Sequence, residues 1–219
     1  MAKAKPAAPV SHLQIFDCEQ GSDEWYQLHL GIPTASHFSV LMAESTDGGP
    51  SMTRTQYLHR LAGEQITGMI AEETFKSKAM MRGKEMEPQA IAAYVEHTGE
   101  QIRRVGFVKN FTGLKHCGAS PDALVGFNGG LETKTIRPDL MIPLLLKGAR
   151  MIPAHKAQVQ GNIWVCERDW WDLSLFYPRM PKFIVKSDRD EKYIRDLSDA
   201  VERFNHDLKT LIEQLRRMS

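Results

Sequence analysis

Two short segments near the middle of the chain carry acidic and basic side chains at a spacing that suits phosphodiester chemistry. Asp122 ends a Ser-Pro-Asp segment, and a Glu-Thr-Lys segment follows after a glycine-containing turn, at Glu132 to Lys134. Hard cations such as Mg²⁺ prefer carboxylate oxygens, so Asp122 and Glu132 are candidate metal ligands. The ammonium of Lys134 could position or polarise a water molecule beside a phosphate. The pattern predicts a metal-assisted site that cuts a phosphodiester.

The register of the intervening turn decides whether these side chains meet. Successive side chains of a strand point to opposite faces of a sheet, and directly opposed residues point to the same face. A two-residue loop at 128–129 would send Asp122 and Glu132 to opposite faces. A three-residue loop at 128–130 places Asp122, Glu132 and Lys134 on one face. The hypothesis requires this odd register, or a bulge with the same effect.

Helices and strands alternate around these segments. Pro88 fits the first turn of a helix that ends at Gly99, which would place Glu87 at the N-terminal end of that helix. The remaining helices are predicted over 22–30, from Thr34, after a cap at Ser51 or Thr53, over 155–168 and from 188 onward. Extended structure is predicted over 101–109, 123–125, 131–136, 171–177 and 183–186. The order predicts one mixed α/β domain over 11–219 after a flexible tail at 1–10.

Composition and charge limit the class of protein. The chain has 219 residues, of which 42% are hydrophobic and 25% are charged, as in folded globular proteins. A net charge of +1 supplies no overall positive field, so DNA binding would need a local groove. Cys18, Cys117 and Cys166 are too far apart for a paired-spacing zinc site and favour a reducing cytoplasm. No stretch approaches the roughly 18 apolar residues of a membrane span, so no membrane association is expected.

Further landmarks lie outside the two central segments. They are the run Leu-Gly-Ile-Pro-Thr-Ala-Ser at 30–36, Gly-Lys-Glu-Met-Glu at 83–87, and Ala-Gln-Val-Gln at 157–160 with Trp164. With these landmarks in this order, almost the whole chain resembles the phage lambda exonuclease, or YqaJ-like viral recombinase, family. The resemblance implies the restriction-endonuclease-like fold, with a central mixed β-sheet flanked by helices.

The same resemblance implies an activity and its partners. It implies a Mg²⁺-dependent exonuclease that degrades one strand of linear double-stranded DNA from the 5′ end and leaves 3′ overhangs for strand annealing. A ring-shaped homotrimer, a single-strand annealing protein as partner and a phage or prophage origin in a bacterial cytoplasm are implied as well.

The matching positions assign roles to five of the residues. Asp122 and Glu132 match the principal metal ligands of the family, and Glu87 matches its helical acidic residue. The main-chain carbonyl of Thr133 adds a further ligand, and Lys134 matches the catalytic lysine that orients the nucleophile. Two Mg²⁺ ions are implied, for which Mn²⁺ would substitute.

Four other positions match polar residues of the family. Gln158 matches a glutamine that can hydrogen-bond a water or a phosphate. Ser36 and Ser120 match hydroxyls of a terminal-phosphate pocket. The arginine of that pocket is replaced here by His29, and a neutral imidazole provides no permanent bidentate positive charge. Dependence on a 5′ phosphate therefore stays open.

Two other functions remain as alternatives. An endonuclease of the same fold would use the same acidic residues and lysine. A non-catalytic DNA-binding scaffold could retain the acidic cluster for structural reasons, although the joint presence of Asp122, Glu132, Lys134 and Glu87 disfavours it. The tryptophans at 164, 170 and 171 are expected to pack in the core rather than to stack on bases.

Overall fold

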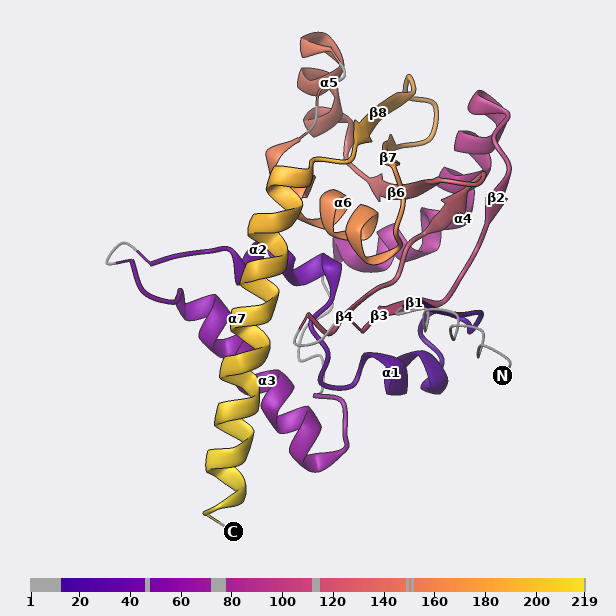
Figure 1. The fold of residues 1–219 in the computed structure, drawn as a ribbon. Helices are drawn as coiled ribbons and strands as arrows, with labels where there is room; N and C mark the ends of the chain where they lie inside the picture. The colour runs from indigo at the N-terminus through magenta and orange to yellow at the C-terminus, as the bar shows by residue number, and fades with distance from the viewer. Residues whose placement is uncertain are drawn as a thin grey trace, which may run out of the picture.

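The computed structural model describes residues 13–45, 48–71, 78–111, 115–148, 150 and 152–218, with only the backbone of Ala79. The predicted tail at 1–10 and the predicted start of the domain at residue 11 lie outside these residues. Figure 1 shows the helices arranged around two β-sheets.

The two sheets carry the strands of the mixed α/β fold. The larger sheet has the order β2-β5-β6-β7-β8, formed by β2 (Ile102–Arg103), β5 (Ala123–Val125), β6 (Gly129–Thr135), β7 (Trp170–Phe176) and β8 (Phe183–Asp188). The smaller has the order β1-β3-β4, formed by β1 (Leu13–Phe16), β3 (Phe107–Asn110) and β4 (Cys117–Ala119). Strands β6 and β7 are parallel, and the other neighbouring strands are antiparallel.

The helices cover both faces of the larger sheet. They are α1 (Asp23–His29), the 3₁₀ turn η1 (Ala35–His37), α2 (Phe38–Leu41), α3 (Met52–Thr67), α4 (Lys78–Thr98), α5 (Pro138–Lys147), α6 (Pro153–Val165) and α7 (Glu191–Arg216). Helices α5 and α6 form the connection that two parallel strands require between β6 and β7. Within the described part of the chain, every helix is too short or too polar to span a lipid bilayer.

Two apolar cores lie on opposite faces of the larger sheet. The larger core joins α6 and α7 to residues such as Leu124 and Leu173. The smaller core joins Tyr94 of α4 to Leu131 of β6. Since side chains alternate along β6, burial of Leu131 against α4 turns Glu132 toward α6.

The predicted helix starts at 22 and 51 are confirmed. The Ser22 hydroxyl accepts a hydrogen bond from the amide of Trp25, and the Ser51 hydroxyl accepts one from the amide of Arg54. The predicted C-terminal helix is confirmed too, although it begins at Glu191 rather than at 188. Its apolar stripe is buried against α2 and α3, and Figure 1 shows α7 running beside both.

The expected position of Pro88 in a first helical turn is wrong. Helix α4 begins at Lys78 and continues through Pro88, so Glu87 lies inside the helix. A proline removes one backbone hydrogen bond, and the turns on either side still hold the helix. Burial of Ile91 and Tyr94 against the sheet anchors its C-terminal half. The earlier turns are charged and mostly exposed, so they show no apolar period in the sequence.

The hairpin before Glu132 has a loop of the predicted length in a different place. The β5–β6 pairs are Ala123 with Leu131 and Val125 with Gly129, which leaves a three-residue loop at 126–128 instead of 128–130. Gly126 takes φ +50° in this loop, a conformation that favours glycine. The odd loop length preserves the register that the hypothesis requires, because Asp122 falls opposite Glu132.

Gly129 and Gly130 belong to strand β6 because tryptophan rings cover them. A Cβ atom on Gly130 would lie 2.2 Å from Cζ3 of Trp171, and one on Gly129 would lie 2.1 Å from Cζ2 of Trp170. Trp171 is fully buried in the larger core, as the sequence predicted. The glycine pair therefore serves ring packing rather than the turn.

We expect Gly130→Ala to lower the free energy of unfolding by about 1–3 kcal/mol, because the new methyl group must displace the buried indole of Trp171. Gly63→Ala is a matched control, since a Cβ there meets no atom within 4 Å and α3 gains a better helix former. Urea denaturation of both variants tests this. Equal stability of the Gly130 variant and the wild type would contradict the packing argument.

Candidate active site

The predicted catalytic residues meet where β5, β6 and α6 come together. Asp122 directly precedes β5, and Glu132 and Lys134 alternate with Thr133 along β6. Gln158 reaches the same place from α6, where its side-chain amide donates to Glu132. The structure thus brings Asp122, Glu132, Lys134 and Gln158 into one cluster.

Three side chains hold the carboxylate of Glu132, which is only 3% exposed. Its Oε1 accepts hydrogen bonds from Nζ of Lys134 at 2.7 Å and from Nε2 of Gln158 at 2.8 Å. Its Oε2 accepts from Nδ2 of Asn162 at 3.1 Å. These donors compensate for the loss of water around a buried charge and fix the orientation of both oxygens.

Asp122 is oriented by the backbone and side chain of Thr133. Its Oδ2 accepts from the amide nitrogen of Thr133 at 2.6 Å and from its hydroxyl at 2.7 Å. Burial raises the pKa of Asp122 to about 8, helped by the negative charges of Glu132 and Glu87 and opposed by the bonds from Thr133. Oδ1 accepts no hydrogen bond from any residue that the structure describes.

Glu87 projects from α4 and adds a third negative charge near this cluster. Its Oε1 accepts from Nη2 of Arg104 at 2.6 Å. Its charge raises the pKa of both Asp122 and Lys134. An ion shared with Asp122 would therefore compete with Arg104 for the Glu87 carboxylate.

Lys134 carries a proton at neutral pH. Burial by itself lowers the pKa of its ammonium, but the charge and hydrogen bond of Glu132 and the charges of Asp122 and Glu87 outweigh burial and raise the pKa above its usual value. Lys134 can therefore donate hydrogen bonds to a water or to phosphate oxygens. It is not set to accept a proton as a general base.

The donor set fits a divalent cation. Asp122 offers a free carboxylate oxygen beside the buried carboxylate of Glu132. A positive ion would offset the burial of Asp122 and its repulsion by Glu132, which together raise its pKa. Across the described residues, no three His, Cys, Asp or Glu side chains are already closed around a single point. Metal binding would therefore draw Glu87 from Arg104, or Glu132 from Lys134, toward Asp122.

The predicted phosphate ligands His29 and Ser120 are engaged with each other. Nδ1 of His29 lies 2.7 Å from the carbonyl oxygen of Trp25 and donates to it, so Nε2 accepts from the Ser120 hydroxyl at 3.0 Å. That hydroxyl in turn accepts from Nε1 of Trp25 at 3.0 Å. The imidazole packs between the rings of Trp25 and Phe107, with centroids 3.7 and 4.0 Å away.

His29 is consequently a neutral residue of the scaffold. Burial lowers its pKa to about 4, against the hydrogen bond to the Trp25 carbonyl, and the positive charge of Lys109 lowers it further. Both ring nitrogens already have partners. The third predicted phosphate ligand, Ser36, is exposed and lies beside Thr34 and His37.

A cavity of about 290 Å³ joins these residues to the catalytic cluster. It lies between α1, η1, α3 and α6. Its lining includes His29, Ser36 and Ser120, together with Gln158 and Asn162, whose amides hold Glu132. A group bound in this cavity would therefore lie next to the carboxylates.

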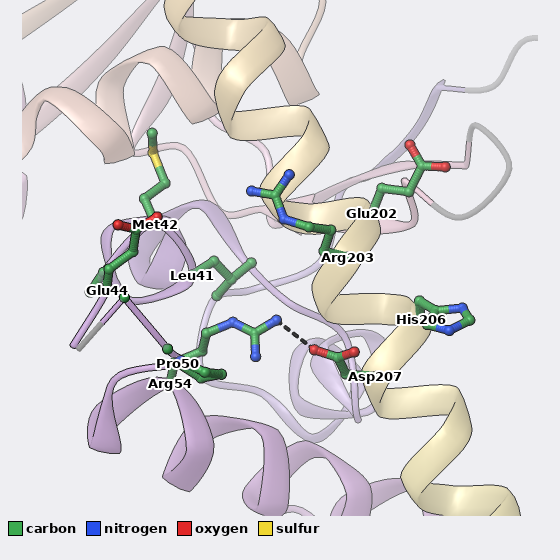
Figure 2. A pocket seen from close by; sticks show the side chains of 12 residues that line it. Leu41, Met42, Glu44, Pro50, Arg54, Glu202, Arg203, His206 and Asp207 are labelled. Carbon is green, nitrogen blue, oxygen red and sulfur yellow. Dashed lines mark hydrogen bonds and ion pairs between the residues drawn. The ribbon is translucent and has the colours of Figure 1, made fainter. Parts of the chain in front are cut away.

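A larger cavity, of about 540 Å³, contains none of the predicted site residues. It lies between α2, the start of α3 and α7. Figure 2 shows Arg54 reaching across it to Asp207, with 2.8 Å between Nη2 and Oδ2, while Glu202 and Arg203 extend from the same helix as Asp207. Both acidic and basic side chains line it, and we assign it no chemistry.

Asn162, whose side chain donates to Glu132 from α6, was not predicted from the sequence. Its side chain is 1% exposed and lies one helical turn after Gln158, so both amides face the same carboxylate. Two amide residues four positions apart lie on the same face of a helix, and this spacing was the feature of the sequence that could have indicated Asn162. An amide that fixes a metal-binding carboxylate acts by positioning it.

We expect Asn162→Ala to reduce kcat by about 10–100-fold, because one oxygen of Glu132 loses its fixed orientation. The control is Asn205→Ala. This change removes a comparable hydrogen bond, from a side-chain amide to the carbonyl of His116, away from the site. Nucleotide release measured over a series of Mg²⁺ concentrations checks this, with a higher Mg²⁺ requirement for Asn162→Ala alone. Identical kinetics of the two variants would argue against the positioning role.

The mixed sheet flanked by helices, with an Asp, Glu and Lys cluster beside it, is a restriction-endonuclease-like nuclease fold. The chain belongs to the YqaJ-like viral recombinase domain family, whose sequence pattern matches residues 24–169. No curated protein matches the chain.

Solved structures show the same relationship. The chain is similar to LHK-Exo, an alkaline exonuclease from Laribacter hongkongensis, with 30% identity and a TM-score of 0.79 over 90% of this chain and 97% of that one. Another structure of LHK-Exo, in complex with dAMP, matches equally well. A phage-related exonuclease from Haemophilus somnus 129PT shares the fold at 17% identity, with a TM-score of 0.59 over 89% of this chain and 99% of that one.

Proposed function

We propose that this protein is a Mg²⁺-dependent exonuclease that degrades one strand of linear double-stranded DNA from the 5′ end. The product would carry 3′ single-stranded overhangs for recombination by strand annealing. The observation that carries the proposal is the meeting of Asp122, Glu132 and Lys134 on one face of the sheet, in a chain of a viral recombinase family. Its likeness to an alkaline exonuclease supports the same assignment.

The acidic residues and the lysine of the cluster have different roles in this reaction. Asp122 and Glu132, with Glu87 and the carbonyl of Thr133, would hold Mg²⁺, most simply as two ions, and Mn²⁺ would substitute. Bound Mg²⁺ supplies activation of the attacking water and stabilisation of the leaving oxygen. Lys134 donates to that water or to the phosphate being cut.

Gln158 and Asn162 act on the carboxylate of Glu132. Their amides hold its two oxygens from one face of α6, so the carboxylate keeps one direction while DNA binds and leaves. Gln158 also lines the cavity, where its carbonyl or amide can contact a water or a phosphate oxygen of the substrate.

For the assembly and the partner, the resemblance to the family is the support. We propose a ring-shaped homotrimer that encloses the duplex, and a single-strand annealing protein that takes up the 3′ overhang. Light scattering of the purified chain tests the first, with a mass three times that of one chain expected. A monomer at micromolar concentration would contradict it.

Labelled DNA tests the activity directly. The protein is incubated with Mg²⁺ and either linear duplex, labelled at the 5′ or the 3′ end, or closed circular duplex, and each reaction is repeated with a chelator. Early release of the 5′ label from linear DNA only, abolished by the chelator, is the expected result. Cutting of the circle would instead indicate an endonuclease, and no metal-dependent loss of DNA would indicate a scaffold.

A further inference from the structure

Two pairs of a cation and a carboxylate lie in and beside the catalytic cluster. Nζ of Lys134 donates to Oε1 of Glu132 at 2.7 Å. Nη2 of Arg104 donates to Oε1 of Glu87 at 2.6 Å. Both carboxylates are proposed ligands of Mg²⁺, so each cation occupies an oxygen that an ion would use. Lys134 has a role in the proposed reaction, whereas Arg104 has none so far.

The backbone next to Arg104 is fixed beside Asp122. The side-chain amide of Gln20 donates to the carbonyl of Val105 at 3.2 Å and to that of Pro121 at 2.9 Å. One side chain therefore ties the residue after Arg104 to the residue before Asp122. On the other side, strand β2 pairs with β5, which begins directly after Asp122. The segment that carries Arg104 thus runs beside the segment that carries Asp122.

The guanidinium of Arg104 has one partner among the described residues. Its side chain is 54% exposed, against 24% for that of Glu87. Nε and Nη1 of Arg104 donate to no residue that the structure describes, so the bond to Glu87 alone holds the guanidinium. If Glu87 took another partner, an unpaired positive charge would remain at the edge of the active site.

The neighbouring arginine has a partner outside the site. Nη2 of Arg103 donates to both carboxylate oxygens of Asp17, at 2.8 and 3.0 Å. The Arg103 side chain is about as exposed as that of Arg104. Asp17 is not a candidate metal ligand, so metal binding would leave the Arg103 pair intact. Arg103 is therefore a matched control for Arg104.

We propose that Arg104 links metal binding to DNA binding by exchanging partners. In the metal-free protein its guanidinium holds the carboxylate of Glu87. When Glu87 turns to a divalent cation shared with Asp122, the released guanidinium binds a phosphate of the DNA backbone. The inference rests on the proposed function and adds a positioning residue to it. A guanidinium suits both partners, because its planar donors match the oxygens of a carboxylate and of a phosphate.

This exchange makes the two binding events favour each other. Metal binding has to break the pair of Arg104 and Glu87, which weakens the affinity for the ion. DNA offsets part of this loss, because a phosphate accepts the hydrogen bonds that Glu87 gives up. Conversely, DNA reaches the guanidinium only after Glu87 has released it.

DNA binding in chelator tests the release of Arg104 without any metal. Glu87→Ala removes the carboxylate that holds Arg104, and fluorescence anisotropy of a labelled duplex gives the dissociation constant. In the Glu87→Ala background, Arg104→Gln should weaken DNA binding about three- to tenfold, since a charged hydrogen bond to a phosphate is lost. In the wild-type background the same change should weaken it by less than about twofold, because Glu87 still occupies the guanidinium.

Mn²⁺ binding in the absence of DNA tests the contact with Glu87. Free Mn²⁺ is followed by its electron paramagnetic resonance signal during a titration of each protein. Arg104→Gln should bind Mn²⁺ about two- to fivefold more tightly than the wild type, because the ion no longer competes with a guanidinium. Arg103→Gln removes an equal charge next in sequence and should match the wild type in both assays.

Three results would overturn the inference while leaving the nuclease in place. They are a wild-type Mn²⁺ affinity in Arg104→Gln, a loss of DNA affinity in chelator that is the same with and without Glu87, and effects of equal size in Arg103→Gln. A wild-type protein that binds no Mn²⁺ and degrades no DNA contradicts the proposed function itself.

Discussion

Replacement of Asp122 or Lys134 by alanine should abolish DNA degradation while the fold survives. Asp122→Ala removes the free carboxylate oxygen next to Glu132, and with it the main attraction for a cation. Lys134→Ala removes the ammonium that donates to the water or phosphate, a loss we expect to lower kcat by about 10³-fold. The rate of nucleotide release measures the loss of activity. A circular dichroism spectrum of each variant checks its fold.

The fold should survive because the cluster lies at the margin of the larger core. Glu132 keeps the amides of Gln158 and Asn162 when Lys134 is removed, so no buried charge is left without a donor. Asp139→Ala and Lys192→Ala remove the same side-chain types from exposed positions and serve as controls. Wild-type rates in both Asp122→Ala and Lys134→Ala would refute the assignment of the site.

Metal binding should couple to stability through Asp122. Its pKa of about 8 in the folded protein exceeds the usual value of 3.8, so between these values the folded state binds more protons than the unfolded state. Stability from this group is therefore greatest at low pH and falls as the pH rises toward 8. Lys134, whose pKa is raised above its usual value of 10.5, keeps its proton throughout this window and does not change the trend.

We accordingly expect Asp122→Asn to stabilise the metal-free protein at pH 8. The free energy of unfolding should rise by about 1–3 kcal/mol, because partial access to water reduces the cost of ionising the carboxyl. This gain corresponds to about 3–10 °C in Tm. At pH 5 the difference should become small. Mg²⁺ should raise the Tm of the wild type at pH 8 and leave that of Asp122→Asn unchanged.

Thermal melts in chelator and in Mg²⁺, at both pH values, check this expectation. Asp139→Asn is the control, because that carboxylate is exposed and its pKa is lowered by its hydrogen bond to Arg137 rather than raised. Equal Tm values for Asp122→Asn and the wild type at pH 8 in chelator would show that neither burial nor the charge of Glu132 penalises ionised Asp122 in the folded protein.

The parts of the structure that depend on local chemistry could be predicted from sequence. Ser22 and Ser51 act as caps because a short hydroxyl side chain can reach the free amides of a first helical turn. The apolar period of the last helix is unbroken, so its buried face was evident. The site followed from strand alternation, which needs only the parity of the hairpin loop.

The parts that depend on distant partners could not be predicted in this way. Gly129 and Gly130 are typical turn residues, and only the rings of Trp170 and Trp171 place them in a strand. Helix α4 continues through Pro88 because the sheet anchors its later turns. Helix α5 was missed because it is apolar nearly throughout and contains Pro143, so no helical period appears.

The phosphate ligands show the same limit. The resemblance placed His29 where the family has an arginine of a phosphate pocket, but the neighbours of His29 decide its state. Trp25 and Ser120 satisfy both imidazole nitrogens, and Phe107 covers the ring. Arg60 lines the same cavity from α3, for which the sequence predicted only a helix after a cap at Ser51 or Thr53.

The most direct test of the metal site is an anomalous-scattering map of a crystal of this protein soaked in Mn²⁺. We expect at least one ion bonded to the carboxylates of Asp122 and Glu132, with Lys134 close by, and we expect this ion to be lost in Asp122→Asn. Saturating Mn²⁺ that leaves no density between these two carboxylates, while both keep the hydrogen bonds described above, would contradict it.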